Sequence, residues 1–148
     1  MVRKFASLCL ALVLVCAVAA PVFAQSGDSL YKRLGGYDAI AAVTDDFIGR
    51  LIADPQTSKF FLGFSHDSKK RIRQHVVDFL CQATGGPCVY TGRDMKTAHA
   101  GSKISEADWD ASIKDLTATL DKFKVPAKEK GEVLNALGPL KSDIVTVH

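Results

Sequence analysis

The feature that most constrains the fold is the spacing of apolar residues along the chain. From Leu30 onward they recur three and four positions apart, and Pro and Gly fall mostly at the boundaries of these stretches. The strict alternation of apolar and polar residues that marks a half-buried strand is scarce. The clearest stripe advances in steps of four, three, four and three, and comprises Trp109, Ile113, Leu116, Leu120 and Phe123. This periodicity predicts an all-α protein.

Four stretches carry the helical spacing. The first, residues 37–54, follows a pair of glycines and stops before a proline, and the second covers residues 68–83. The third begins after Ser105, a residue type that caps helix N-termini, and has acidic residues in its first turn, where the helix dipole favours negative charge. Pro126 can open the fourth, because proline is tolerated at the first position of a helix. The chain is long enough for these helices to share one core.

Residues 94–103 fit this pattern poorly, although they contain His99. Helical bundles usually connect successive helices by a few residues, so a longer stretch of poorly periodic chain is unusual. A short helix ending at Gly101 can hold the histidine. We therefore expect something other than a neighbouring helix to pack against this segment.

The first 24 residues differ in composition from the rest. A basic end with Arg3 and Lys4 precedes an apolar stretch, and a small-residue cleavage sequence, VFA, ends at Ala24. This order is typical of a secretory signal peptide, and an uncleaved membrane anchor is the alternative because the stretch approaches spanning length. We expect a signal peptide at 1–24 and one domain at 25–148, exported to a bacterial periplasm and free of the membrane after cleavage.

Removal of the signal peptide would change the charge of the chain. It leaves 17 basic and 16 acidic residues, so the formal charge falls from +3 to +1. A nearly neutral chain does not predict a nucleic-acid surface. We expect a monomer that binds no nucleic acid.

Cys81 and Cys88 are the cysteines that remain after the signal peptide. The six residues between them include two glycines, so the chain can turn back on itself, and an oxidising compartment favours a disulfide. Two free thiols are the alternative. The spacing and the lack of a second pair disfavour zinc. The absence of C-x-x-C-H excludes a c-type cytochrome.

Three stretches together resemble one known family. They are SLYKRLGGYDAI, VTDDFIGRLIADPQTSKFF and FLCQATGGPCVYTGRDMKTAHAG. The resemblance is to the group 1 truncated haemoglobins, the two-over-two helical globins, and it extends from about Leu30 to Val145. It implies an all-α truncated globin sandwich around one haem b per chain.

The resemblance also implies roles for single residues. His99 matches the proximal histidine, and imidazole nitrogen suits haem iron. Phe61 matches the phenylalanine that packs on the porphyrin. The other residues expected around the cofactor are Tyr90, Arg93 and Lys96 at the propionates or the proximal edge, and Phe79 and Met95 in the pocket.

The distal side departs from the family pattern. Many members have a tyrosine after the phenylalanine that corresponds to Phe47, and this chain has Ile48 there. The family often has a glutamine at the position of Val76, and Ile72 lies nearest the distal histidine of other globins. A dioxygen ligand carries partial negative charge, so the missing donors should cost about 1–3 kcal/mol of its stabilisation.

His75 precedes Val76 on the apolar face of its helix. Some cyanobacterial members have a histidine here that binds the iron, which implies a resting state with two histidine ligands. Alternatively, His75 turns toward a propionate or solvent. The preceding segment, FLGFSHDSKKR, is about three residues longer than in compact relatives and contains His66, which we expect to be exposed.

Three functions are compatible with these residues. The first is binding of dioxygen, nitric oxide and carbon monoxide at haem iron. The second is redox chemistry with an unknown electron donor: nitric oxide dioxygenation, nitrite reduction, peroxide chemistry or electron transfer. The third is a helical binding protein without haem, which would leave His99 without a role.

Overall fold

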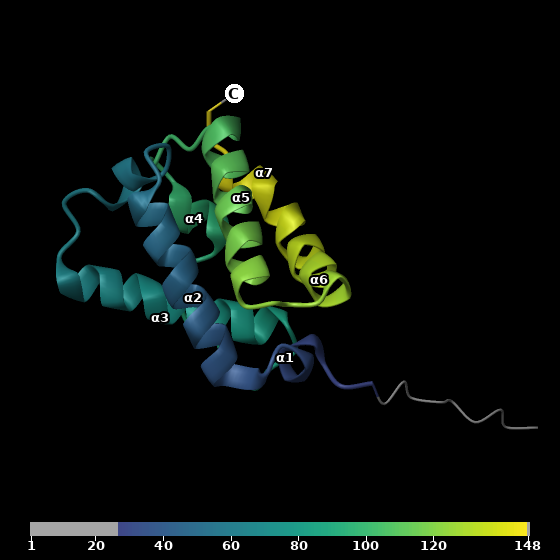
Figure 1. Ribbon diagram of the computed structural model, residues 1–148. Coiled ribbons are helices and arrows are strands. Elements are labelled where there is room, and N and C mark those ends of the chain that lie inside the picture. Colours follow the sequence, from purple (N-terminus) through teal and green to yellow (C-terminus); the bar gives the residue numbers. More distant parts are fainter. Residues whose placement is uncertain (1–26, 148) are drawn as a thin grey trace, which may run out of the picture.

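The computed structural model describes residues 27–147, and the expected signal peptide lies outside them. The described residues form helices, as the periodicity predicted, and the longest connection covers residues 84–94 between two of them (Figure 1). No helix among them is both long and apolar enough to cross a membrane. The helices, in chain order, are α1 (Leu30–Arg33), α2 (Gly36–Ala53), η1 (Ser58–Phe61), α3 (His66–Ala83), α4 (Met95–His99), α5 (Glu106–Lys122), α6 (Ala127–Leu137), η2 (Gly138–Leu140) and α7 (Lys141–Ile144).

Capping side chains fix where several helices begin. Ser65 accepts a hydrogen bond from the backbone N–H of Ser68 at the start of α3, so this helix begins two residues before the predicted position. Ser105 and Asp108 form a reciprocal capping box at the start of α5, which confirms the predicted N-cap. Such caps contribute on the order of 1 kcal/mol each.

Pro126 precedes the last long helix and lies outside it. Its ψ of 152° is extended, and α6 begins at Ala127. The carbonyl of Pro126 accepts a hydrogen bond from the N–H of Lys130, so the proline acts as the N-cap. The prediction that Pro126 occupies the first helical turn was therefore wrong by one position.

The long helices pack as two pairs. Figure 1 shows α2 crossing α3, while α5 and α6 lie side by side. Ile40 from α2 and Val77 and Leu80 from α3 are buried in the core of the first pair. Leu116 and Leu120 from α5 are buried against Val133 from α6 in the second core. The helix α2 also contacts α5 and so joins the two pairs.

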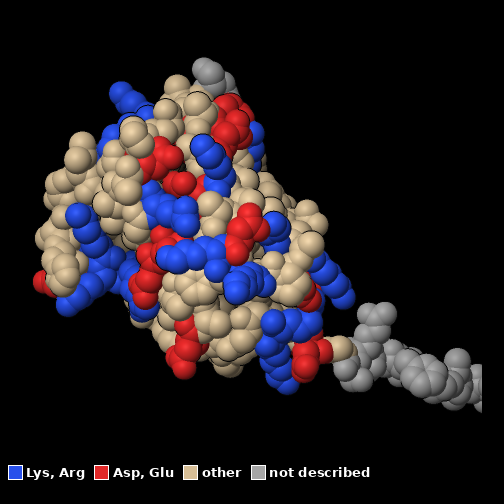
Figure 2. Space-filling model, viewed as in Figure 1, with Lys and Arg blue, Asp and Glu red and all other residues tan. Residues whose placement is uncertain are grey.

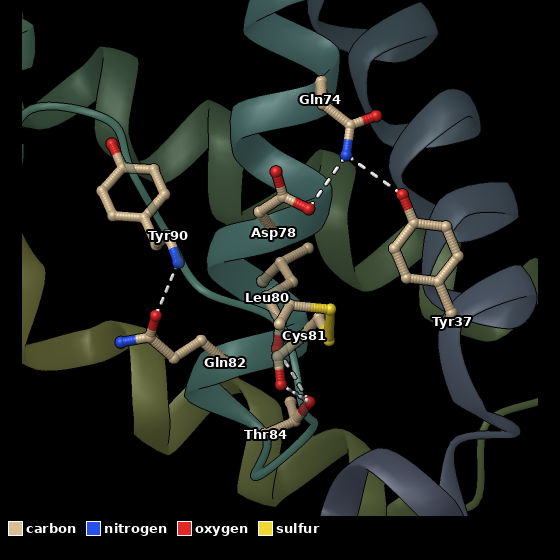
Figure 3. Close-up of a disulfide and its surroundings, with 9 residues drawn as sticks. Tyr37, Gln74, Asp78, Leu80, Cys81, Gln82, Thr84 and Tyr90 are labelled. Carbon is tan, nitrogen blue, oxygen red and sulfur yellow. Dashed lines mark hydrogen bonds between the residues drawn. A yellow bond between two sulfur atoms is a disulfide. The ribbon is translucent and has the colours of Figure 1, made fainter.

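A disulfide ties the end of α3 to the loop that follows. Cys81 is fully buried in the last turn of α3 and is bonded to Cys88, with 5.7 Å between the Cα atoms (Figure 3). The N–H of Gly86 donates to the carbonyl of Cys81 at 2.8 Å. A Cβ atom at Gly86 would lie 2.5 Å from the ring of Tyr31, so only glycine fits at this turn.

The C-terminal residues return to the segment after α4. The N–H groups of Thr146 and Val147 both donate to the carbonyl of Ile104, at 2.9 and 3.1 Å. Val145 and Ile104 are buried beside this contact. The end of the described chain therefore closes one side of the fold.

Candidate cofactor site

A large cavity lies between the two helix pairs and the short helix α4. Its volume is about 630 Å³, within the range of pockets that enclose a cofactor. Most of the residues expected around a cofactor line this cavity. They are Phe47, Ile48, Phe61, Ile72, His75, Val76, Phe79, Tyr90, Arg93, Met95 and His99.

Lys96 is the exception among the expected residues. It lies in α4 between Met95 and His99, is exposed, and does not line the cavity. One residue along a helix turns the side chain by about 100°, so neighbours of a cavity-facing residue point elsewhere. Sequence proximity to His99 did not bring Lys96 to the site.

His99 lies at the end of α4, and two local interactions set its position. Asp94 caps the helix by accepting a hydrogen bond from the N–H of Thr97 at 2.8 Å. This bond holds the pKa of Asp94 below its usual value. The Nδ1 atom of His99 lies 2.8 Å from the carbonyl oxygen of Met95. Because a carbonyl only accepts, Nδ1 carries the proton and donates it, and Nε2 keeps its lone pair for a metal.

The donor groups of the described chain fit haem better than a bare metal ion. No three His, Cys, Asp or Glu side chains within residues 27–147 come together to hold a metal. A metal at His99 therefore needs most of its ligands from elsewhere, and a porphyrin supplies four nitrogens. The apolar cavity walls around His99 suit the flat, apolar macrocycle.

The three positions where the distal side departs from the family pattern are apolar, although Ser68, Arg71 and His75 of α3 also line the cavity. Ile48 is buried in α2, and Ile72 and Val76 line the cavity from α3. None of the three has a hydrogen-bond donor on its side chain. Of the polar lining groups, Thr57 donates its hydroxyl to the carbonyl of Leu51. At these three positions, which the resemblance assigns to the distal side, the side chains therefore shape the cavity but offer a ligand no hydrogen bond.

Asp108 also lines the cavity, but its carboxylate is already bound. Its side chain is buried and accepts hydrogen bonds from Lys59 at 2.7 Å and Gln56 at 2.6 Å. The backbone N–H and hydroxyl of Ser105 donate to the other oxygen. Asp108 thus joins the turn after α2 to the start of α5, and it is not free to bind a ligand.

His75 is exposed, yet it lines the same cavity as His99. Its ring meets that of Tyr90 edge to face, with 6.0 Å between centroids, and Tyr90 meets Phe79 in the same way at 5.3 Å. The loop after the disulfide positions Tyr90: its N–H donates to the side-chain oxygen of Gln82 at 2.7 Å (Figure 3). His66 is exposed, as predicted, and does not line the cavity.

Several residues that line the cavity were not predicted to contact a cofactor, because their apolar type and helical spacing indicated only burial in the core. Trp109 and Ile113 begin the α5 stripe and face the cavity, and Leu137, Leu140 and Ile144 close it from the C-terminal helices. Phe60 and Phe64 add two aromatic rings on either side of Phe61. The signal available for these residues was their apolar type, which does not separate a cofactor wall from an ordinary core.

Comparisons with known proteins agree with this geometry. The family model for bacterial-like globins matches residues 29–146. The group 1 truncated hemoglobin GlbN of Mycolicibacterium paratuberculosis is 36% identical over 118 residues, covering 80% of this chain and 85% of that protein. The group 1 truncated hemoglobin GlbN of Synechocystis is 34% identical and covers 74% of this chain and 90% of its own.

Solved structures show the same fold. The truncated hemoglobin of Tetrahymena pyriformis in its Fe(III) form superposes with a TM-score of 0.73 at 29% identity, covering 80% of this chain and 98% of the other. The 2/2 hemoglobin of Synechococcus, in the cyanomet state with covalently attached heme, has the same TM-score at 28% identity and the same coverage. A family model matches most of this chain, its helices have the two-over-two arrangement, and Nε2 of His99 keeps a lone pair for a metal. This chain therefore belongs to the group 1 truncated haemoglobins and is a haem-binding globin.

Proposed function

We propose that the cavity holds one haem b per chain, with Nε2 of His99 as the proximal ligand, and that the protein binds dioxygen, nitric oxide and carbon monoxide. When bound, haem would supply an iron atom that coordinates such diatomic ligands. The observation that carries the proposal is the hydrogen bond from His99 to Met95 inside a large apolar cavity.

The chain's own residues prepare the site on both sides. The Met95 carbonyl holds the imidazole in one tautomer and one orientation, so little reorganisation accompanies ligation. Ile48, Ile72 and Val76 give the cavity an apolar surface on α2 and α3. They donate no hydrogen bond, so these three positions give bound dioxygen no advantage over carbon monoxide.

Ile48→Tyr tests the missing donor directly. We expect the haem-loaded variant to release dioxygen about tenfold more slowly, because a hydrogen bond to a partly charged ligand contributes about 1–3 kcal/mol. Stopped-flow measurement of dioxygen release gives the rate. Ile48→Phe is the control, because it has similar bulk and no hydroxyl. Equal slowing in both variants would show that bulk, and not the hydroxyl, controls release.

A redox function is the second candidate, and the position of His75 on the cavity wall favours it. A second histidine ligand would keep the iron environment similar in both oxidation states, which suits electron transfer. External ligands would then compete with His75 for the iron. Their apparent affinity would be reduced in proportion to the fraction of sites that His75 leaves open. Nitric oxide dioxygenation, nitrite reduction and peroxide chemistry belong to the same class.

His75→Ala separates the two candidates. If His75 is a ligand, the ferric wild type has a six-coordinate low-spin absorption spectrum and the variant becomes high-spin. His66→Ala is the matched control, because His66 is exposed on the same helix and away from the cavity. A high-spin spectrum in both wild type and His75→Ala would exclude iron ligation by His75 and favour an open, apolar gas-binding site.

We also propose that the protein is exported to the periplasm. Residues 1–24 have the order of basic, apolar and small residues that signal peptidases recognise. In the periplasm the protein would lack cytosolic flavin reductants, so oxidised iron would need another electron donor. Cell fractionation with N-terminal sequencing checks this, and a mature protein that begins at Gln25 is the expected result.

A further inference from the structure

Charge is unevenly distributed along the chain. Residues 66–103, which form α3, α4 and their connections, carry seven Lys or Arg and three Asp. The other described residues carry ten Lys or Arg and thirteen Asp or Glu. The segment that carries both cavity histidines is therefore net positive by four charges, although the described chain as a whole is nearly neutral.

Ion pairing follows the same division. Outside residues 66–103, seven of the ten basic residues pair with a carboxylate: Lys32, Arg33, Arg50, Lys59, Lys122, Lys130 and Lys141. Within residues 66–103, only Arg73 has such a partner among the described residues, namely Asp45. The positive charges left without an internal partner therefore concentrate in α3, α4 and the connections next to them.

Two of these unpaired residues line the cavity, and the others lie close to cavity-lining residues along the chain. We call them the basic face: Lys69, Lys70, Arg71, Arg93, Lys96 and Lys103. Arg71 and Arg93 line the cavity itself, beside the exposed His75. Figure 2 shows Lys and Arg side chains gathered at the left, over the first turns of α3, while blue and red alternate over the centre of the view.

We propose that the basic face is the docking surface for an acidic electron-transfer protein, which delivers single electrons to the haem; this rests on the proposed function. One electron leaves the reduced cofactor of the partner, which is oxidised, and ferric iron is reduced to ferrous, with no bond made or broken. Charge complementarity steers such partners to the exposed edge of a cofactor, and their interfaces are small and transient.

A charged protein fits this surface better than a membrane. A helix that lies in a lipid interface needs an exposed apolar face. The apolar residues of α3 face the core and the cavity, and its exposed positions carry charged or polar residues and one alanine. The preceding loop does expose Leu62 and Phe64, so an anionic membrane is the competing partner that the experiment must include.

The test measures binding to a probe of known charge. Isothermal titration calorimetry of the haem-loaded protein with an acidic flavodoxin, chosen for its negative charge and not as the periplasmic donor, gives the dissociation constant at low salt. We expect Lys69→Glu/Lys70→Glu to weaken binding about tenfold or more, and raised salt to weaken wild-type binding likewise. Acidic residues near the start of α3 suit the helix dipole, so this variant should fold.

The chain offers a matched control. Lys114 and Lys128 are exposed, have no ion-pair partner among the described residues, and lie in α5 and α6 outside the basic face. Lys114→Glu/Lys128→Glu makes the same change in net charge and should bind within about twofold of wild type. Reduction of the ferric protein by reduced flavodoxin, followed by stopped flow, should show the same order of variants.

Three results would overturn the inference. Equal weakening of flavodoxin binding in both double variants would mean that binding depends on the net charge of the protein and not on the basic face. If the haem-loaded wild type did not bind flavodoxin, acidic electron-transfer proteins would be excluded as the partner. Binding to phosphatidylserine vesicles in place of flavodoxin would assign the face to a membrane. Haem uptake, read from absorbance in each sample, separates these outcomes from failure of the proposed haem function.

Discussion

His99→Gly is expected to lose at least about tenfold in haem affinity and the absorption spectrum of a histidine-ligated iron. The variant removes the one cavity histidine whose ring is already oriented by a backbone carbonyl, and losing even an outer partner of a metal ligand costs 10–100-fold. Haem titration followed by quenching of Trp109, the single tryptophan, measures the affinity. The wild type should show a break at one haem per chain.

Imidazole in solution provides the positive control. Glycine at position 99 leaves space in the cavity for a free imidazole, which should restore the wild-type spectrum. His66→Gly removes an exposed histidine and should leave both affinity and spectrum unchanged. A His99→Gly variant with the wild-type spectrum in the absence of imidazole would show that another residue holds the iron.

Asp108→Ala should lower the free energy of unfolding by about 2 kcal/mol, because it removes a helix cap and several hydrogen bonds to a charged group. The buried carboxylate accepts hydrogen bonds from Lys59, Gln56 and Ser105, so the substitution removes them together and ends the capping box of α5. Urea unfolding measures the change. Asp110→Ala is the control, because Asp110 is exposed on the same helix and makes no ion pair with a described residue.

The same carboxylate makes stability depend on pH. Burial by itself would raise the pKa of Asp108, but hydrogen bonds from Lys59, Ser105 and Gln56 outweigh it and hold the pKa well below its usual range. The carboxylate therefore contributes its full stabilisation above the unfolded pKa of about 4, and this contribution is lost as the pH falls toward the folded pKa. The difference between wild type and Asp108→Ala should shrink between neutral pH and about pH 3. A constant difference would show that packing, and not the charge, stabilises the site.

The sequence predicted the long helices well because their stability comes from a repeated pattern. Trp109, Leu116 and Leu120 mark one face of α5 whatever packs against it. The short helix α4 has no such repeat, and it ends at His99, two residues before the expected Gly101. Its bounds depend on the Asp94 cap and on Ala100, whose ψ of 130° is extended.

Side-chain direction at the site was harder to predict than residue type. Lys96 and His75 are both near the cofactor motif, but Lys96 is exposed and does not line the cavity, whereas His75 lines it against Tyr90. The orientation of Tyr90 depends in turn on Gln82 and on the turn closed by the disulfide. A sequence pattern does not show that these residues lie close together in space, so it could not predict these contacts.

The contact of the C-terminal residues with Ile104 has a consequence for when the protein can take up its cofactor. Leu137, Leu140 and Ile144 close the cavity, and Thr146 and Val147 anchor this closing segment. A chain leaves the ribosome N-terminus first, so these residues emerge after α2, α3 and α4. A nascent chain can form α2, α3 and α4 but not a complete pocket, and we expect stable cofactor capture only after residues 137–147 have emerged and folded back.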